Sequence, residues 1–489
     1  GWGLLGGAGL LVVVALGRQE RQGRGLALLV PLAALADLWS VGRGYNPTVP
    51  PAAYFPPTAV TDLLQAQPGP ARSVATGWIL PPNTNLAYGL ADLRGYDALT
   101  PQTYYDLLRA LDPTLPVRAG GGLRPLMTLA PPLLDLLNGR YLPAAPGDTP
   151  NERLDVQQDG AHDEVVGEIT GPYRVGQTFV AGADGLTAVQ VVGATFGHPA
   201  AGRLRFHLQR DPAAATDLAT VTVDAATLGD EATWTFRFPP LRQAQGRTFY
   251  FYFDAPDVAA AQAVTVYYTK GNPYPAGSRM QDGRPAGGDL VFRTIVALDP
   301  DHPPFERVLD GGSGGTSVYL NRNAQPRAWL VHRVETVADP AARVRRLAEP
   351  AFDRAGTALL ATPLPADQPL TTPPAAGTDK VTILGYAPET VDLATRSDTA
   401  GLLVLADQAF PGWSATVDGQ AAPILTADHA LRGVYLPAGA HSVRFTYAPL
   451  VFRLGAALTL IALLVVGWLG IKKSPAQNAG DAVTRREAD

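Results

Sequence analysis

The strongest constraint on the fold is the C-terminal stretch, where β-hairpin signals run without a linker into an apolar segment. The dipeptides Pro411-Gly412 and Asp418-Gly419 are turn signals flanked by half-apolar runs, which predicts a small antiparallel β-domain. Residues 454–471 then contain no charged side chain. Such a segment is long enough to cross a hydrocarbon layer of roughly 30 Å. We therefore expect the β-domain to continue directly into a transmembrane helix.

The composition narrows the class of protein. The chain has 489 residues, of which 46% are hydrophobic and 17% charged, with a net charge of -5 and no cysteine. The length predicts about three domains, and a charged fraction below the roughly 25% of soluble domains fits a protein partly dissolved in lipid. The negative net charge gives no reason to expect nucleic-acid binding. Without cysteine, the chain forms neither disulfides nor thiolate metal sites.

The placement of charge predicts the membrane topology. Three apolar segments cover residues 2–16, 26–39 and 454–471. A short stretch with Arg18, Arg21 and Arg24 lies between the first two segments, and Lys472 and Lys473 follow the third. Short basic stretches next to a membrane segment are typical of cytoplasmic loops. The arginine stretch and the lysine pair can both lie in the cytoplasm only if residues 40–449 lie outside it. We thus expect a multi-pass protein of the cell membrane with a large extracytoplasmic region.

The N-terminus predicts that the chain is the C-terminal part of a longer protein. It starts with Gly1 inside an apolar run that extends to Leu16, and no charged n-region or small-residue cleavage site marks a signal peptide. The first transmembrane helix is therefore expected to be truncated.

The pattern between the membrane segments predicts a mainly β protein with some α structure. Helices are expected from Pro101 to Asp112, from Pro131 to Gly139, and from Pro340 to Glu349 with Asp339 as N-cap. We predict transmembrane helices at 1–40, an outer α+β domain at 41–150, an inserted jelly-roll β-sandwich at 151–298, an outer β-rich domain ending in a hairpin sandwich at 299–448, a transmembrane helix at 449–471 and a cytoplasmic tail at 472–489.

The inserted region shows period-two alternation. Leu204, Phe206 and Leu208 alternate with polar residues, and so do Trp234 and Phe236. Each pattern is typical of a strand with one buried face. About eight such strands suggest the jelly roll. Because this module is an insertion, the parts on either side of it are expected to pack together.

Two motifs have simpler interpretations than catalysis or metal binding. The residues around Ser313 match the G-x-S-x-G nucleophile elbow, but the flanks DGGSGGT lack the strand and helix that this elbow needs, so a flexible turn is favoured. The seven histidines are scattered without a short-spaced pair, which argues against a zinc site. No cofactor is evident.

Two groups of residues are candidates for substrate binding. The loop PPNTNLAYGLADLRGYDAL gathers polar and aromatic groups, including an arginine able to hold a phosphate or carboxylate bidentately: Asn83, Asn85, Asp92, Arg94 and Tyr96. Alternatively, these groups satisfy the backbone of an irregular loop. In TFYFYFD, Tyr250 and Tyr252 share the strand face opposite to the phenylalanines and could stack on sugars, or else cover a sheet edge. Trp413 and Arg432 are expected to serve packing and a salt bridge.

Several motifs in order resemble the C-terminal half of YfhO-type bacterial membrane proteins. They read LADLRGYDAL, TYYDLLRAL, VYLNRNAQPRAWLV, LLVLADQAFPGWSATVDGQAAPI and LRGVYLPAGAHSVRFTYAP followed by FRLGAALTLIALL. The resemblance covers roughly residues 26–150 and 304–469, and the sandwich departs from it as an accessory module.

The resemblance implies a glycosyltransferase of the GT-C type. Such an enzyme moves a sugar from a polyprenyl-phosphate carrier to a cell-envelope glycan acceptor at the outer face of the membrane. Its catalytic acid, and any divalent metal, would lie in an outer loop before Gly1, so no catalytic residue is assigned in this fragment. The expected partners are membrane lipid, the lipid-linked sugar and the glycan. The alternative is a non-enzymatic, membrane-anchored carbohydrate-binding protein of the envelope.

Overall fold

The computed structural model describes residues 35–472, except for 41, 44, 46–48, 96–99, 116–125, 127–128, 130, 147, 159, 161, 163, 313–314 and 371–377. These residues are mainly β with some α, and none of their sheets closes into a barrel. The first apolar segment, the arginine loop, most of the second segment and Ser313 lie outside the described residues.

Residues 1–62 form a unit of their own. Its described elements are a helical stretch at 35–40, helix α3 at Pro51–Tyr54 and the beginning of helix α4 at Ala59–Gln65.

A mixed sheet joins strands from before and after the sandwich, as the insertion predicts. Its order is β17-β18-β3-β1-β2, with bounds Phe305–Leu309, Ser317–Asn321, Gly139–Ala144, Arg72–Ser73 and Ala91–Asp92. The helices near it are η1 at Thr84–Tyr88, α5 at Gln102–Leu111, α6 at Pro131–Leu136 and α7 at Pro340–Ala348. One apolar core includes Val74 and Leu108 from the earlier part and Val331 and Leu402 from the later part. The two parts therefore share a hydrophobic core.

The predicted helices are present with small shifts at their ends. Pro101 is the N-cap of α5, so the helix begins one residue later than predicted and ends at the residue before Asp112. Helix α6 begins at Pro131 but ends at Leu136, because Asn138 adopts a positive φ of 58° and Gly139 already begins β3. The Asp339 side chain accepts a hydrogen bond from the Ala342 amide and caps α7, as predicted.

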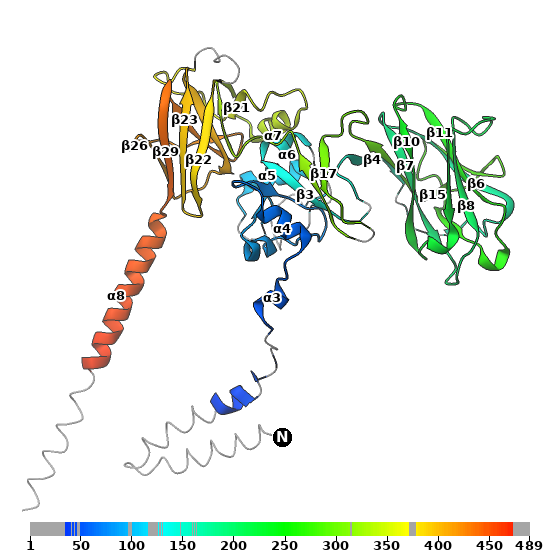
Figure 1. Cartoon of the computed structure of the whole chain (residues 1–489), viewed down its shortest axis with the longest axis horizontal. Coiled ribbons are helices and arrows are strands. Elements are labelled where there is room, and N and C mark those ends of the chain that lie inside the picture. Colours follow the sequence, from blue (N-terminus) through cyan, green and yellow to red (C-terminus); the bar gives the residue numbers. More distant parts are fainter. Residues whose placement is uncertain are drawn as a thin grey trace, which may run out of the picture. The chain divides into compact units, whose positions relative to one another are not determined.

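Two sheets form the sandwich, and their strands face one another (Figure 1). One sheet contains β4 at Glu152–Gln158, β5 at Glu164–Val165, β7 at Leu186–Ala194, β10 at Ala232–Leu241, β12 at Thr265–Thr269, β15 at Asp289–Leu290 and β16 at Phe292–Ala297. The other contains β6 at Gly171–Val180, β8 at Arg203–Gln209, β9 at Ala219–Asp224, β11 at Thr248–Ala255, β13 at Arg279–Gln281 and β14 at Arg284–Ala286. Short 3-10 turns are η2 at Ala225–Thr227 and η3 at Ala260–Gln262.

The alternating residues build the sandwich core. Phe206 of β8 stacks on Phe236 of β10 with ring centroids 5.1 Å apart, and Phe251 of β11 packs against both Phe206 and Phe292. All four rings are buried. The period-two prediction for these strands is confirmed, although the region holds more strands than the eight expected.

The C-terminal region has three further sheets. The first sheet contains β19 at Ala328–Val331, β24 at Gly401–Gln408, β28 at Leu431–Leu436 and β27 at Leu425–Ala427. The second contains β20 at Arg333–Thr336 and β21 at Thr357–Leu360. The third contains β22 at Lys380–Ala387, β23 at Thr390–Ser397, β29 at Gly439–Tyr447, β25 at Trp413–Val417 and β26 at Gln420–Ala422. Asp418 and Gly419 both have positive φ and form the predicted tight turn between β25 and β26.

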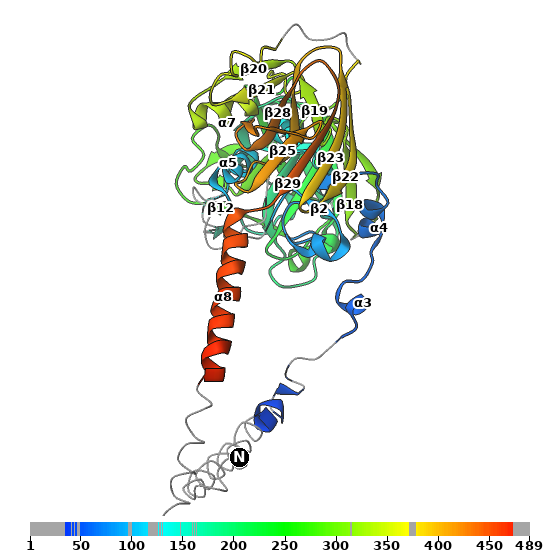
Figure 2. The ribbon, with the colours of Figure 1, turned by 90° about the vertical axis from the view of Figure 1, so that its left-hand side faces the viewer.

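Helix α8, Leu450–Lys472, continues from the end of β29 (Figure 2). Its stretch Leu450–Trp468 has 19 residues, a mean hydropathy of 2.3 and no burial against the protein. Among the described residues it is the one helix long and apolar enough to cross a membrane.

Candidate functional site

The polar loop predicted to bind a ligand forms contacts within the chain. Asn83 occupies the N-cap position of η1 with φ 76°, and the buried Asn85 donates a hydrogen bond to the Leu90 carbonyl at 2.8 Å. Asp92 and Arg94 form a bidentate ion pair at 3.1 and 2.8 Å, with both side chains almost fully buried. The arginine expected to hold a ligand anion therefore holds an anion of its own chain. Tyr96 lies outside the described residues, and the ligand role of this group stays a prediction.

Tyr250 and Tyr252 lie on the face of β11 that points away from the phenylalanine core. Their rings stack on each other at 5.5 Å, and Tyr252 also stacks on His207 at 4.5 Å. They form a small buried cluster with Met280, and only 3% and 6% of the two tyrosines is exposed. A sugar would reach their faces only if the covering side chains moved. Sugar binding by these tyrosines stays a prediction.

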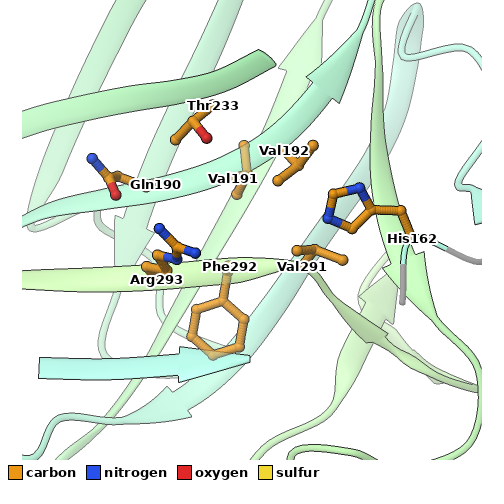
Figure 3. Close-up of a pocket in the computed structure, with 8 residues that line it drawn as sticks. All are labelled: His162, Gln190, Val191, Val192, Thr233, Val291, Phe292 and Arg293. Atoms are coloured by element: carbon orange, nitrogen blue, oxygen red, sulfur yellow. The ribbon is translucent and has the colours of Figure 1, made fainter. Parts of the chain in front are cut away.

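An open cavity of about 280 Å³ lies on the outer face of the other sandwich sheet (Figure 3). Gln190 of β7 and Arg293 of β16 lie at one end of it, Thr233 of β10 at its side, and His162 at the other end. These side chains come from three neighbouring strands and a connecting segment. The cavity is thus built by tertiary structure rather than by one loop.

Strand register produces a polar row beside this cavity. Gln190 is the cross-strand partner of both Thr235 and Arg293, and Arg293 is also the partner of Gln157 on β4. Because side chains alternate across a sheet, these four point to the same outer face. Gln190 donates a hydrogen bond to the Thr235 hydroxyl at 3.1 Å. The row offers amide, hydroxyl and guanidinium groups across four strands.

An aromatic pair borders the far end of the cavity. The rings of His162 and Tyr267 lie 5.4 Å apart with an interplanar angle of 32°. The Tyr267 hydroxyl donates to Glu231 at 3.4 Å, and burial together with this carboxylate raises the pKa of Tyr267. A row of hydrogen-bonding groups next to an aromatic pair is the combination that sugar-binding sites use.

A second polar centre is buried around Asp407 on β24. Its carboxylate accepts hydrogen bonds from Arg72 at 3.1 Å and Arg327 at 3.0 Å, and it forms an ion pair with Arg432 at 3.0 Å. The Tyr386 hydroxyl donates to both carboxylate oxygens at 3.0 Å. Burial alone would raise the pKa of Asp407, but the three arginines and the tyrosine lower it below its ordinary value. The carboxylate is therefore held ionised as the shared counterion of three cations.

This cluster connects three sheets. Arg72 belongs to β1 of the mixed sheet, Asp407 and Arg432 to the β24–β28 sheet, and Tyr386 to β22 of the last sheet. Arg432 lies over the Trp413 ring at 3.8 Å. The expectation that Arg432 and Trp413 serve a salt bridge and packing is thus confirmed. The sequence did not predict the other members of the cluster, which are Arg72, Arg327, Asp407 and Tyr386. The only signal for them in the sequence is a charged residue within an otherwise apolar strand pattern.

A third buried group lies in the turn between β27 and β28. Asp428 and His429 both have positive φ, at 47° and 73°. Asp428 accepts a hydrogen bond from the Leu359 amide at 2.8 Å, and burial raises its pKa to about 7 against the lowering effects of this bond and of Arg354. His429 contacts Asp106 at 3.1 Å. The buried carboxyl is therefore expected to titrate near neutral pH.

One known protein family matches the C-terminal part of the chain, which contains most of the Asp407 cluster. The model of the family described as bacterial membrane protein YfhO matches residues 378–459. Residues 378–459 belong to the YfhO family of bacterial membrane proteins. The YfhO segment contains Tyr386, Asp407 and Arg432, together with the hairpins and the first part of α8. No curated protein matches the sequence.

Solved structures show only distant likeness. One is the cysteine protease and lectin-like domains of Cwp84, a surface layer associated protein of Clostridium difficile, with 9% identity, a TM-score of 0.22 and coverage of 31% of this chain and 37% of that chain. Two structures of the arabinofuranosyltransferase AftD from Mycobacteria have 10% identity and TM-scores of 0.16 and 0.14. They cover 67% and 65% of this chain, which in turn spans 28% and 24% of theirs.

Replacing Asp407 by asparagine is expected to destabilise the protein strongly. The change leaves three buried arginines without their counterion, a loss of about 3–5 kcal/mol. The matched control is Asp392→Asn, whose partner Arg444 is largely exposed, so we expect a loss of at most ~1 kcal/mol. Chemical unfolding of the detergent-solubilised chain measures both. Equal effects of the two substitutions would contradict the role of the cluster.

Replacing Asp428 by asparagine is expected to change the pH dependence of stability. A carboxyl whose folded pKa of about 7 exceeds its unfolded value binds a proton on folding, so its contribution falls as pH rises from ~4 to ~7 and is constant above. Asp428→Asn should remove this slope, because an amide does not titrate.

Unfolding free energies at mildly acidic and mildly basic pH test this expectation. The control is Asp367→Asn at an exposed position, which should leave the slope unchanged. An unchanged slope in Asp428→Asn would show that another group titrates.

Proposed function

We propose that this chain is the extracytoplasmic glycan-binding region of a YfhO-family membrane protein that acts on cell-envelope glycopolymers. The cavity between Gln190, Thr233, Arg293 and His162 supports the proposal most directly. It combines hydrogen-bonding groups from several strands with a neighbouring aromatic pair, and it opens on the sheet surface, where a long polymer could lie.

The chemistry of the row favours a hydroxyl-rich ligand. Glutamine donates and accepts hydrogen bonds, threonine does both through one hydroxyl, and arginine donates from a planar fork. Adjacent sugar hydroxyls need such mixed donors and acceptors. The cavity is also lined by Val191, Val192, Val291 and Phe292, so a ligand that presents hydroxyls together with apolar ring faces suits it.

The apolar helix α8 supports placement at a membrane. In this proposal α8 crosses the bilayer, residues 40–449 lie outside the cytoplasm, and membrane lipid is a partner. The sandwich would then meet glycans of the cell envelope at the outer membrane face.

Glycosyl transfer is the second candidate function; it rests on what the resemblance to YfhO-type proteins implies, and the YfhO family model matches residues 378–459. In this candidate the whole protein transfers sugar from a polyprenyl-phosphate carrier, and the described region binds and orients the acceptor. No catalytic residue is assigned among the described residues. Transfer of labelled sugar from a polyprenyl-phosphate donor to an envelope glycan by the full-length protein would distinguish this enzyme from a protein that only binds glycan.

Replacing Arg293 by alanine is expected to weaken glycan binding about tenfold, because the ligand loses charge-assisted hydrogen bonds. Gln190→Ala should have a smaller effect in the same direction. Binding to immobilised bacterial envelope oligosaccharides, measured with the purified chain in detergent, provides the test.

The matched control is Arg284→Ala, which removes another exposed arginine, on β14 of the opposite sheet. It should leave binding unchanged. Absence of binding to any envelope oligosaccharide, or equal losses in Arg293→Ala and Arg284→Ala, would contradict the proposal.

A further inference from the structure

The turn before β25 lies directly against the start of α8. The Ala448 amide donates a hydrogen bond to the Gly412 carbonyl at 2.9 Å. Gly412 has φ +104°, and a Cβ there would lie 2.9 Å from the Tyr447 ring and 3.1 Å from Pro449. Only glycine allows the turn to approach the chain so closely. The position of the turn is therefore fixed relative to the first residue of the helix, Leu450.

The length of the apolar helix then sets the depth of the turn. The apolar stretch Leu450–Trp468 has 19 residues and is about 28 Å long, close to the thickness of the hydrocarbon layer. If α8 spans this layer, Leu450 lies at its outer edge. Arg453, one turn further, can extend its side chain back to the lipid headgroups. The turn at residues 410–413 consequently lies in the interfacial layer.

The side chains of this turn suit that layer. Phe410 is 45% exposed although it is large and apolar. Trp413 is half-buried and packs against Tyr447 with ring centroids 5.3 Å apart. Aromatic residues concentrate at membrane interfaces, where the ring contacts acyl chains and the polar atoms contact headgroups. The exposed ring of Phe410 thus has a suitable environment in the outer leaflet.

We propose that the turn formed by Phe410, Pro411, Gly412 and Trp413 is a second membrane contact, with Phe410 inserted into the interface of the outer leaflet beside α8. This inference rests on the proposed membrane placement of α8. Two adjacent contacts fix the tilt of the C-terminal sheets relative to the membrane, whereas a single helix would let these sheets rotate. Through Arg432, which covers Trp413, the contact is also connected to Asp407.

The absence of cysteine makes a direct test possible. Single substitutions Phe410→Cys, Phe196→Cys and Leu460→Cys are labelled with an environment-sensitive fluorophore. The full chain is then reconstituted into vesicles of equal parts phosphatidylcholine and phosphatidylglycerol, with or without lipids that carry a quencher. Phe196 is the matched control because it is also 45% exposed but lies in a sandwich loop. Leu460 reports insertion of α8.

We expect quenching lipids to reduce fluorescence about twofold at positions 410 and 460 and to leave position 196 unchanged, since interfacial groups lie within 5–10 Å of the acyl boundary. Quenching at 460 without quenching at 410 would overturn the inference and leave the membrane anchor intact. Equal quenching at 410 and 196 would also overturn it. No quenching at 460 would contradict the membrane placement itself.

Discussion

The C-terminal half of this structure depends on one buried carboxylate that three arginines share. Asp407 is 4% exposed and contacts Arg72, Arg327 and Arg432. Desolvation of these cations is costly, and a single anion with a tyrosine hydroxyl compensates for it. The cluster joins strands that are far apart in sequence, including a pair 335 residues apart. Removing the carboxylate would therefore affect three sheets at once.

The same cluster links the core to the turn beside helix α8. Arg432 contacts Asp407 on one side and covers Trp413 on the other, and the turn before Trp413 lies against the start of α8. A continuous series of contacts thus runs from the start of α8 through the aromatic ring of Trp413 to the buried ion pair of Arg432 and Asp407. The motifs PGW and LRG of the YfhO segment therefore contact each other in the fold through Trp413 and Arg432.

Local physical rules made much of the fold predictable. The alternation around Phe206 and Phe236 identified the sandwich core, and Asp339 identified the start of α7, because burial and capping depend on neighbouring residues. The Asp407 cluster could not be predicted, since a charge in an apolar strand does not reveal its partner. The polar row of Thr235, Gln190 and Arg293 depends on register between strands, which sequence periodicity leaves open.

In the proposed function, the sandwich cavity faces the outside of the cell and binds envelope glycan. A single cysteine at Thr233 in the cysteine-free chain tests both parts, through its reaction with a membrane-impermeant maleimide on intact cells. We expect labelling without permeabilisation and slower labelling when envelope oligosaccharides are added, whereas Asp398→Cys, in an exposed turn between β23 and β24, should react at an unchanged rate. Labelling at 233 only after permeabilisation, or a rate that glycans do not change, would contradict it.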